Sequence, residues 1–156
     1  MNSTTGKDIT QALKAVGANN VFRVRAQAYY FADWRNRIDT MGKEKKTSGL
    51  NWWIAEGVLT FEGADGTTAD VSIEGADYQE CGFLDKTAIS GLRQLGKASC
   101  VTVTISDGHL VFTEKTERMR LSSRFAIHEP AADNGYIAYG MTKAIAQKKE
   151  YEERNQ

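Results

Sequence analysis

Between residues 83 and 123 the spacing of hydrophobic residues changes from a helical to an extended period. Four apolar residues fall on one side of a helix at 3.6 residues per turn: Ala88, Ile89, Leu92 and Leu95. Asp85 and Thr87 carry oxygens that can cap the first backbone amides of this helix, and Gly96 can end it in a left-handed conformation. The pattern predicts an amphipathic helix from residue 85 to about residue 96.

Beyond this helix, apolar and polar residues alternate. Val101, Val103 and Ile105 are separated by threonines, which is the period of a half-buried strand rich in β-branched residues. Asp107-Gly108 predicts a two-residue type I′ turn, because glycine accepts the positive φ that this turn needs. The pattern then predicts a return strand, a turn and a third strand, over residues 109–113, 114–117 and 118–122.

The first part of the chain has a similar order of elements. Ile9, Leu13 and Val16 follow helical spacing and predict a helix over residues 7–17, which Gly17 can end. The start MNSTTGKDIT leaves no room for a strand ahead of this helix. Alternating segments then predict three strands, with turns at 56–57 and 63–66 between them: 50–55, 58–62 and 67–74.

The two halves together predict an α+β fold in which two helices pack on small antiparallel sheets, with residues 75–82 as a connection. Each half is a helix followed by a three-strand meander, an internal pseudo-repeat. One of the adjacent tryptophans, Trp52, shares a face with Ile54, and Trp53 points to the other face. We expect the core to consist of Ile9, Leu13, Trp52, Ile54, Leu59, Phe61, Val71, Ile73, Ile89, Leu92, Val103, Ile105, Leu110 and Phe112.

Residues 20–49 interrupt the first half. A strand is expected at 21–25, residues 26–38 suit either a strand or a helix, and 41–49 look like a mobile basic loop. Aromatic residues lie here among arginines, a combination that suits a protein interface or nucleic acid equally well. A locally packed insertion with outward charges is the simpler alternative. The candidate protein-binding residues are Arg23, Arg25, Tyr29, Tyr30, Trp34, Arg35 and Arg37.

The chain ends in a segment of different character. Pro130 marks a boundary, because the residue before a proline is pushed away from the helical conformation. Ile137, Met141 and Ile145 then recur at helical spacing ahead of a charged run. We therefore expect one domain over residues 1–130 and a C-terminal helical tail over 131–156.

The succession in residues 50–125 resembles one domain of a DNA sliding clamp, the bacterial polymerase processivity ring. The resemblance is carried by WWIAEGVLTFEGADGTTADVSIEG, the helix DKTAISGLRQLG and the hairpin VTVTISDGHLVFTEKTERMRLSS. It implies inner helices that face DNA phosphates. A bacterial clamp chain has three such domains, whereas this sequence has material for one, and residues 20–49 and the tail are additions. The resemblance therefore does not imply that this chain closes a ring. Nor does it imply the peptide-binding pocket that clamps form near the junction between two domains.

Basic residues on the two predicted helices suit the phosphate contact that the resemblance implies. Lys86, Arg93 and Lys97 are spaced by seven and four, and Lys7 and Lys14 by seven, so each group lies on one side of its helix. Lysine and arginine on such a face bind phosphates without reading sequence. An ordinary solvated helix face is the alternative interpretation.

Composition limits other functions. Twenty basic and twenty acidic residues cancel, so the whole chain has no field that attracts nucleic acid. Cys81 and Cys100 lack metal or redox spacing and are expected to be small buried residues. His109 and His128 are isolated, Asp65 is explained by its turn, and no nucleophile, metal or phosphate-loop motif occurs. We expect neither an enzyme nor a cofactor or metal.

Two non-enzymatic functions remain open. The first is a protein-binding module, for example a phage or mobile-element product that modulates or inhibits a host nucleic-acid-processing complex; its small size and Arg/aromatic insertion favour it. The second is a clamp-like DNA-binding processivity factor that acts as a homo-oligomer. A dimer is expected from unpaired sheet edges. The polar N-terminal segment and the lack of a long apolar segment predict a cytoplasmic protein without a membrane partner.

Overall fold

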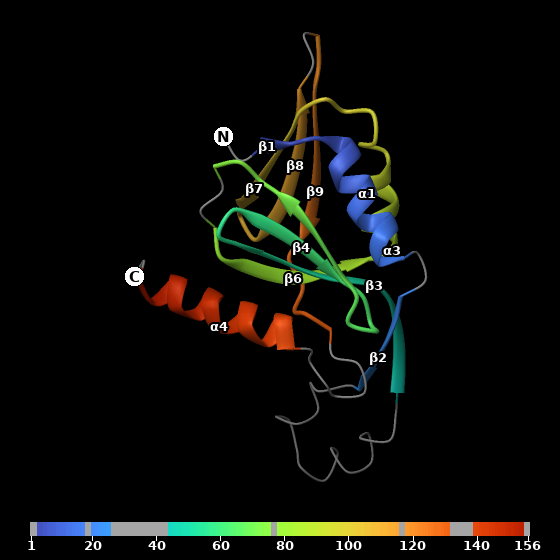
Figure 1. The fold of residues 1–156 in the computed structure, drawn as a ribbon, viewed down its shortest axis with the longest axis vertical. Coiled ribbons are helices and arrows are strands. Elements are labelled where there is room, and N and C mark those ends of the chain that lie inside the picture. The colour runs from blue at the N-terminus through green and yellow to red at the C-terminus, as the bar shows by residue number, and fades with distance from the viewer. Residues whose placement is uncertain are drawn as a thin grey trace.

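The computed structural model has an α+β fold, as the sequence predicts. It describes residues 3–17, 20–25, 44–75, 78–115, 118–131 and 139–154. Within these ranges three helices and two antiparallel sheets are present (Figure 1). Two of the helices lie side by side against the sheets, and the third crosses elsewhere on the molecule.

The smaller sheet contains the meander predicted from the second half of the chain. Its strand order is β1 (Ser3–Thr4), β7 (Val101–Ser106), β8 (His109–Lys115) and β9 (Arg120–Ala126). Asp107 and Gly108 both have positive φ, 50° and 71°, which confirms the predicted type I′ turn between β7 and β8.

The larger sheet is built around one long strand, β3 (Glu44–Ala55). Along its length β3 pairs with three strands: β2 (Val21–Arg25), β4 (Val58–Glu62) and β6 (Glu80–Asp85). The strand β5 (Thr68–Ser72) continues the sheet beyond β4. The turn between β3 and β4 also has positive φ at both residues, 54° at Glu56 and 77° at Gly57.

Two strands were not predicted, and each joins the sheet of the other half. β1 lies ahead of the first helix, where the sequence left no room for a strand, and its two residues pair with β7. β6 replaces the expected connection over 75–82 and the start of the helical segment, and it pairs with β3. β1 is too short to show a period, and β6 is buried over four consecutive residues, so neither alternates.

Residues 44–49 are also a strand, whereas a basic loop was predicted. Here β3 pairs with β2, from Glu44 opposite Arg25 to Ser48 opposite Val21. At Gly49 the strand then meets β6: a Cβ at this position would lie 2.1 Å from the carbonyl oxygen of Leu84. Glycine therefore permits the close approach of the two backbones. The expected strand at 21–25 is confirmed.

Both amphipathic helices have side-chain N-caps, of which only that of the second helix was predicted. α1 (Gly6–Val16) begins where the Thr5 hydroxyl accepts from the amide of Asp8, and Gly17 follows it with a φ of 101°. α3 (Lys86–Arg93) begins where Asp85 accepts from the amide of Ala88 at 2.8 Å. α3 is shorter than predicted: it ends before Gln94 in a right-handed turn, and Gly96 is not among the described glycines with positive φ.

One hydrophobic core joins the two helices to both sheets. α1 packs on β4, β5 and α3, whereas α3 packs on β3, β6 and β9. Twelve of the fourteen predicted core residues are fully buried, and Ile89 and Ile105 are half-buried at the margin of the same cluster. Trp52 is completely buried and Trp53 is partly exposed, as the strand pattern predicts.

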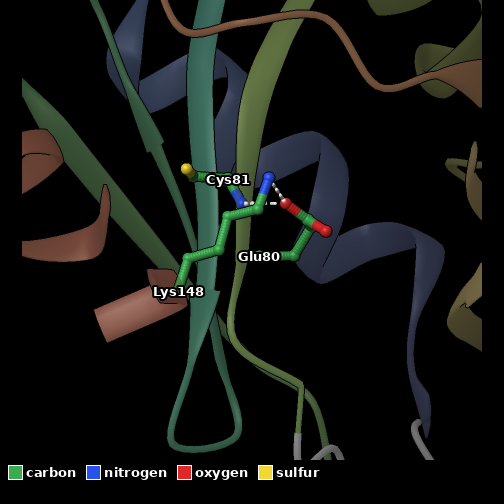
Figure 2. Close-up of polar contacts among 3 residues, drawn as sticks. All are labelled: Glu80, Cys81 and Lys148. Atoms are coloured by element: carbon green, nitrogen blue, oxygen red, sulfur yellow. Dashed lines mark hydrogen bonds and ion pairs between the residues drawn. The ribbon is translucent and has the colours of Figure 1, made fainter. Parts of the chain in front are cut away.

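The predicted C-terminal helix is α4 (Tyr139–Arg154), which packs against β3 and β6. Its buried residues Met141 and Ala144 form a second small cluster with Cys81 and Trp53. Figure 2 shows the polar edge of this contact: Lys148 forms an ion pair with a carboxylate oxygen of Glu80, which also accepts the amide of Cys81 at 3.0 Å. The tail residues 139–154 are thus anchored on the outer face of the larger sheet.

The residues that follow β9, up to residue 131, are held by a buried side-chain amide. Asn51 on β3 is 2% exposed, and its side chain donates to the carbonyl of Ala131 and accepts from the amide of the same residue, both at 2.8 Å. The amide of Phe83 also donates to the carbonyl of His128. These contacts satisfy buried polar groups and hold residues 128–131 across the larger sheet.

The burial of α3 leads to a stability prediction. Leu92 is completely buried, so Leu92→Ala should lower the free energy of unfolding by about 2–5 kcal/mol. Ile89→Ala is the matched control, because Ile89 is half-buried and its truncation should cost less. Urea denaturation measures both variants. A loss below about 0.5 kcal/mol for Leu92→Ala, the range of surface sites, would contradict the placement of this helix.

Glu62 leads to a prediction about pH. This β4 residue is 3% exposed, and desolvation raises the pKa of its carboxyl group from 4.5 to about 6. The neutral form is therefore favoured in the folded protein, so its contribution to stability is present below pH 4.5 and is lost as pH rises through 6. Glu62→Gln should gain stability relative to the parent between pH 4 and pH 8, by at most about 2 kcal/mol. Urea denaturation at both pH values tests this, and an unchanged difference would contradict it.

Candidate nucleic-acid interface

The candidate interface is the layer formed by α1 and α3, which lie antiparallel and side by side (Figure 1). The amide of Gly6, at the start of α1, donates to the carbonyl of Ala98 beyond the end of α3, at 2.9 Å. At the opposite end, Gly17 after α1 lines the same pocket as Lys86 at the start of α3. The two helices therefore run in opposite directions along their shared length.

Glycine at position 6 allows this close contact. A Cβ on Gly6 would lie 1.5 Å from the carbonyl oxygen of Leu95, a distance that no real contact permits. A larger residue would therefore push the start of α1 away from the turn after α3. Gly6 thus allows the close spacing of the layer, and Thr5 directly before it caps α1.

The structure brings the five predicted basic residues onto this layer. Each of them is solvent-exposed, and on α1 the two lysines are turned away from the buried side that contains Ile9 and Leu13. One placement is corrected: α3 ends at Arg93, so the last residue lies in the turn that follows, which meets the start of α1. The five residues are Lys7 and Lys14 on α1, Lys86 and Arg93 on α3, and Lys97 in that turn.

Carboxylates are few on the helices themselves. Asp8 is exposed in the first turn of α1, where it complements the helix dipole. Asp85 is the N-cap of α3, and its carboxylate is occupied by the amide of Ala88. Over residues 6–16 and 86–97 the basic side chains therefore outnumber the acidic ones five to one. The layer is positive although the whole chain is neutral.

A small pocket of about 130 Å³ lies within this layer, between the end of α1, the bend of β3 and α3. Its lining contains the cations Lys86 and Arg93, with Ser90 between them on the same side of α3, and no carboxylate. Asn20 supports the wall: its side chain donates to the carbonyl of Gly17 and accepts from the amide of Ala64, both at 3.0 Å. A pocket with this lining suits one phosphate-sized anion.

The uncharged residues of this pocket were not predicted from the sequence. Asn20 and Ser48 come from the interrupted region at 20–49, and Ser90 lies among ordinary polar residues of a helix surface. A signal for Ser90 exists, since it lies four residues after Lys86 and three before Arg93 and so shares their side of the helix. No comparable signal connects Asn20 or Ser48 with α3.

The predicted protein-binding residues are placed only in part. Arg23 and Arg25 belong to β2, but their side chains lie outside the described residues. The other five lie wholly outside them: Tyr29, Tyr30, Trp34, Arg35 and Arg37. Their role as a protein-binding surface stays a prediction.

The cysteines, Asp65 and His109 show no sign of a catalytic or metal-binding role in the described residues. Burial raises the pKa of the Cys81 thiol to about 11, so it is protonated at neutral pH, whereas Cys100 is exposed rather than buried as predicted. Asp65 accepts from the amide of Thr67, as its turn predicts, and His109 contacts the carbonyl of Asp107. No group of metal-ligating side chains occurs among the described residues.

Comparisons with protein-family models, with curated proteins and with solved structures return no match for this chain. In the part of the chain that the structure describes, no helix is long and apolar enough to cross a membrane. A function must therefore be inferred from the residues and their geometry.

Proposed function

We propose that this is a non-enzymatic, clamp-like protein whose α1–α3 layer binds the phosphate backbone of duplex DNA. The observation that carries the proposal is the exposure of Lys7, Lys14, Lys86, Arg93 and Lys97 on two neighbouring antiparallel helices. Cations on a rigid surface bind phosphates through Coulomb attraction and the release of counterions, without reading base sequence.

The fold topology supports this proposal. A clamp domain has a strand ahead of its first helix, and β1 occupies that position although the sequence offered little room for it. The remaining order contains the elements of the resemblance, a Gly-turn hairpin, a third strand, an inner helix, a second hairpin and a last strand bearing arginines, with β6 as an additional strand directly ahead of the inner helix. In such domains the helices form the layer that faces DNA.

The pocket beside α3 gives the layer a fixed point of contact. Lys86 and Arg93 can neutralise one phosphate there, while the Ser90 hydroxyl is available as a hydrogen-bond donor. The lysines of α1 lie on the neighbouring helix and can contact further phosphates along the strand. Sequence-independent binding follows, because none of these contacts requires a base edge.

Assembly remains part of the proposal. One such domain covers only part of a ring, so encircling DNA would need several copies, and a homodimer is the simplest assembly. Binding of a host protein complex, the first function considered, depends on residues 23–37, and the described side chains do not favour it over DNA.

The DNA proposal predicts a salt-dependent affinity that depends on the helix layer. Fluorescence anisotropy with a duplex of random sequence should give a log–log slope of affinity against salt of about −4.5 if all five cations contact phosphates. Lys14→Glu/Lys86→Glu/Arg93→Glu should abolish binding at 0.1 M salt. All three residues are exposed, so the variant should retain its circular dichroism spectrum.

The matched control changes the same number of charges on α4. Lys143→Glu/Lys149→Glu/Arg154→Glu alters three exposed residues of that helix and shifts the net charge equally. This variant should retain at least about half of the parent's affinity. Equal losses in the two variants would mean that total charge, and not the α1–α3 layer, determines binding, and would refute the proposal.

A further inference from the structure

A second surface combines an open strand edge, an apolar pocket and a row of arginines. β9 is the last strand of the smaller sheet, and within the described ranges only β8 pairs with it. Exposed edges with unpaired backbone groups can accept an additional strand. Leu121 on β9 is 52% exposed, and Met119 just before it is 55% exposed, so part of this edge is apolar.

The register of the sheet identifies which backbone groups are open. The amide of Ile127 donates to the carbonyl of Gly108, which makes these two residues a hydrogen-bonded pair of the β8–β9 ladder. Such pairs alternate along an antiparallel ladder, so odd-numbered residues of β9 bond to β8. The even-numbered residues therefore direct their N–H and C=O groups to the open edge: Arg120, Ser122, Arg124 and Ala126.

The apolar pocket lies beside this edge. Its volume is about 330 Å³, and it occupies the corner between β9, β6 and the first turn of α3. Phe83, Leu84, Ala88 and Phe125 supply most of its apolar lining. Because β9 itself lines the pocket through residues 124–126, a strand added to the edge would place a side chain at its mouth.

The charges around the edge are mainly basic. Arg118, Arg120 and Arg124 are exposed along or just before β9, and Arg124 also lines the pocket. The single carboxylate of the pocket lining, Asp85, is already bonded to the amide of Ala88. An incoming chain with acidic side chains would therefore meet complementary charge.

We propose that β9 and this pocket bind an extended acidic peptide segment of a partner protein by strand addition. The peptide backbone bonds to the open groups of β9, an apolar side chain enters the pocket, and acidic side chains pair with Arg120 and Arg124. Strand addition of this kind takes its affinity from the backbone and its specificity from pockets for alternate side chains. Nucleic acid would use the arginines but neither the open amides nor the apolar pocket. The site touches the first turn of α3, but none of the five basic residues of the α1–α3 layer lines it.

The probe is a short synthetic peptide in which glutamate alternates with leucine or phenylalanine, carrying a fluorescent label. It should bind the full chain saturably, and a peptide with lysine in place of glutamate should bind at least tenfold more weakly. Arg120→Glu/Arg124→Glu should weaken the glutamate peptide at least tenfold. Lys143→Glu/Arg154→Glu, exposed residues of α4, is the matched control and should leave its affinity within about twofold.

Two further readouts separate strand addition from simple charge attraction. N-methylation of alternate peptide amides should abolish binding in one frame and spare it in the other, because only every second residue bonds to the edge. Hydrogen exchange followed by NMR should show new protection of the Ser122 and Arg124 amides in the complex. The proposal would be overturned if N-methylation abolished peptide binding in both frames or in neither. It would also be overturned if the newly protected amides lay outside β9.

The remaining outcomes are also decisive. No saturable binding of the glutamate peptide would overturn the proposal. Light scattering and exchange on the protein alone test for a second copy of this chain: a dimer with Ser122 and Arg124 already protected would make β9 a self-association edge and reject a peptide partner. Lys14→Glu/Lys86→Glu/Arg93→Glu should retain peptide binding, so a failure of the DNA proposal leaves this result unaffected.

Discussion

The fold depends on the exchange of a leading strand between its two halves. β6 from the second half pairs with β3 over six residues, and β1 from the first half pairs with β7. Because each strand leads directly into a helix, this exchange brings α1 and α3 together over one common core. Gly49 and Gly6 matter because a Cβ at Gly49 would collide with the backbone of β6, and a Cβ at Gly6 would collide with the turn that follows α3. The helix layer is therefore a consequence of strand pairing.

The exchange also separates two surfaces with different chemistry. The exposed side of α1 and α3 carries lysines and an arginine on rigid helices, which suits a phosphate backbone. The β9 edge offers open backbone groups beside apolar side chains, which suits a polypeptide. α4 occupies a third region, where Met141 and Ala144 cover Cys81 on the outer face of the larger sheet. A DNA-associated protein with a separate docking edge is consistent with this division.

Local patterns predicted most of the fold because they are strong here. The alternation in β7, the Asp107-Gly108 turn and the caps Asp85 and Gly17 all depend on neighbouring residues, and they were read correctly. β6 could not be predicted, because a strand buried on both faces has no period and its partner in β3 is distant in the sequence, with Glu80 opposite Ile54 and Asp85 opposite Gly49. The five basic residues were predicted because their spacing along each helix is a local pattern. Asn20 and Ser48 were not predicted, because only the tertiary fold brings them to the pocket beside α3.

In the function that we propose, the α1–α3 layer is the surface that binds DNA. The most direct measurement is an NMR titration of isotope-labelled protein with a short duplex of random sequence. We predict that the amide shifts that change are those of residues 7–17 and 86–97, with Asn20 and Ser48 beside the pocket, and that those of β9 and α4 do not. Changes confined to the sheets or to α4, with the helices unaffected, would contradict the account.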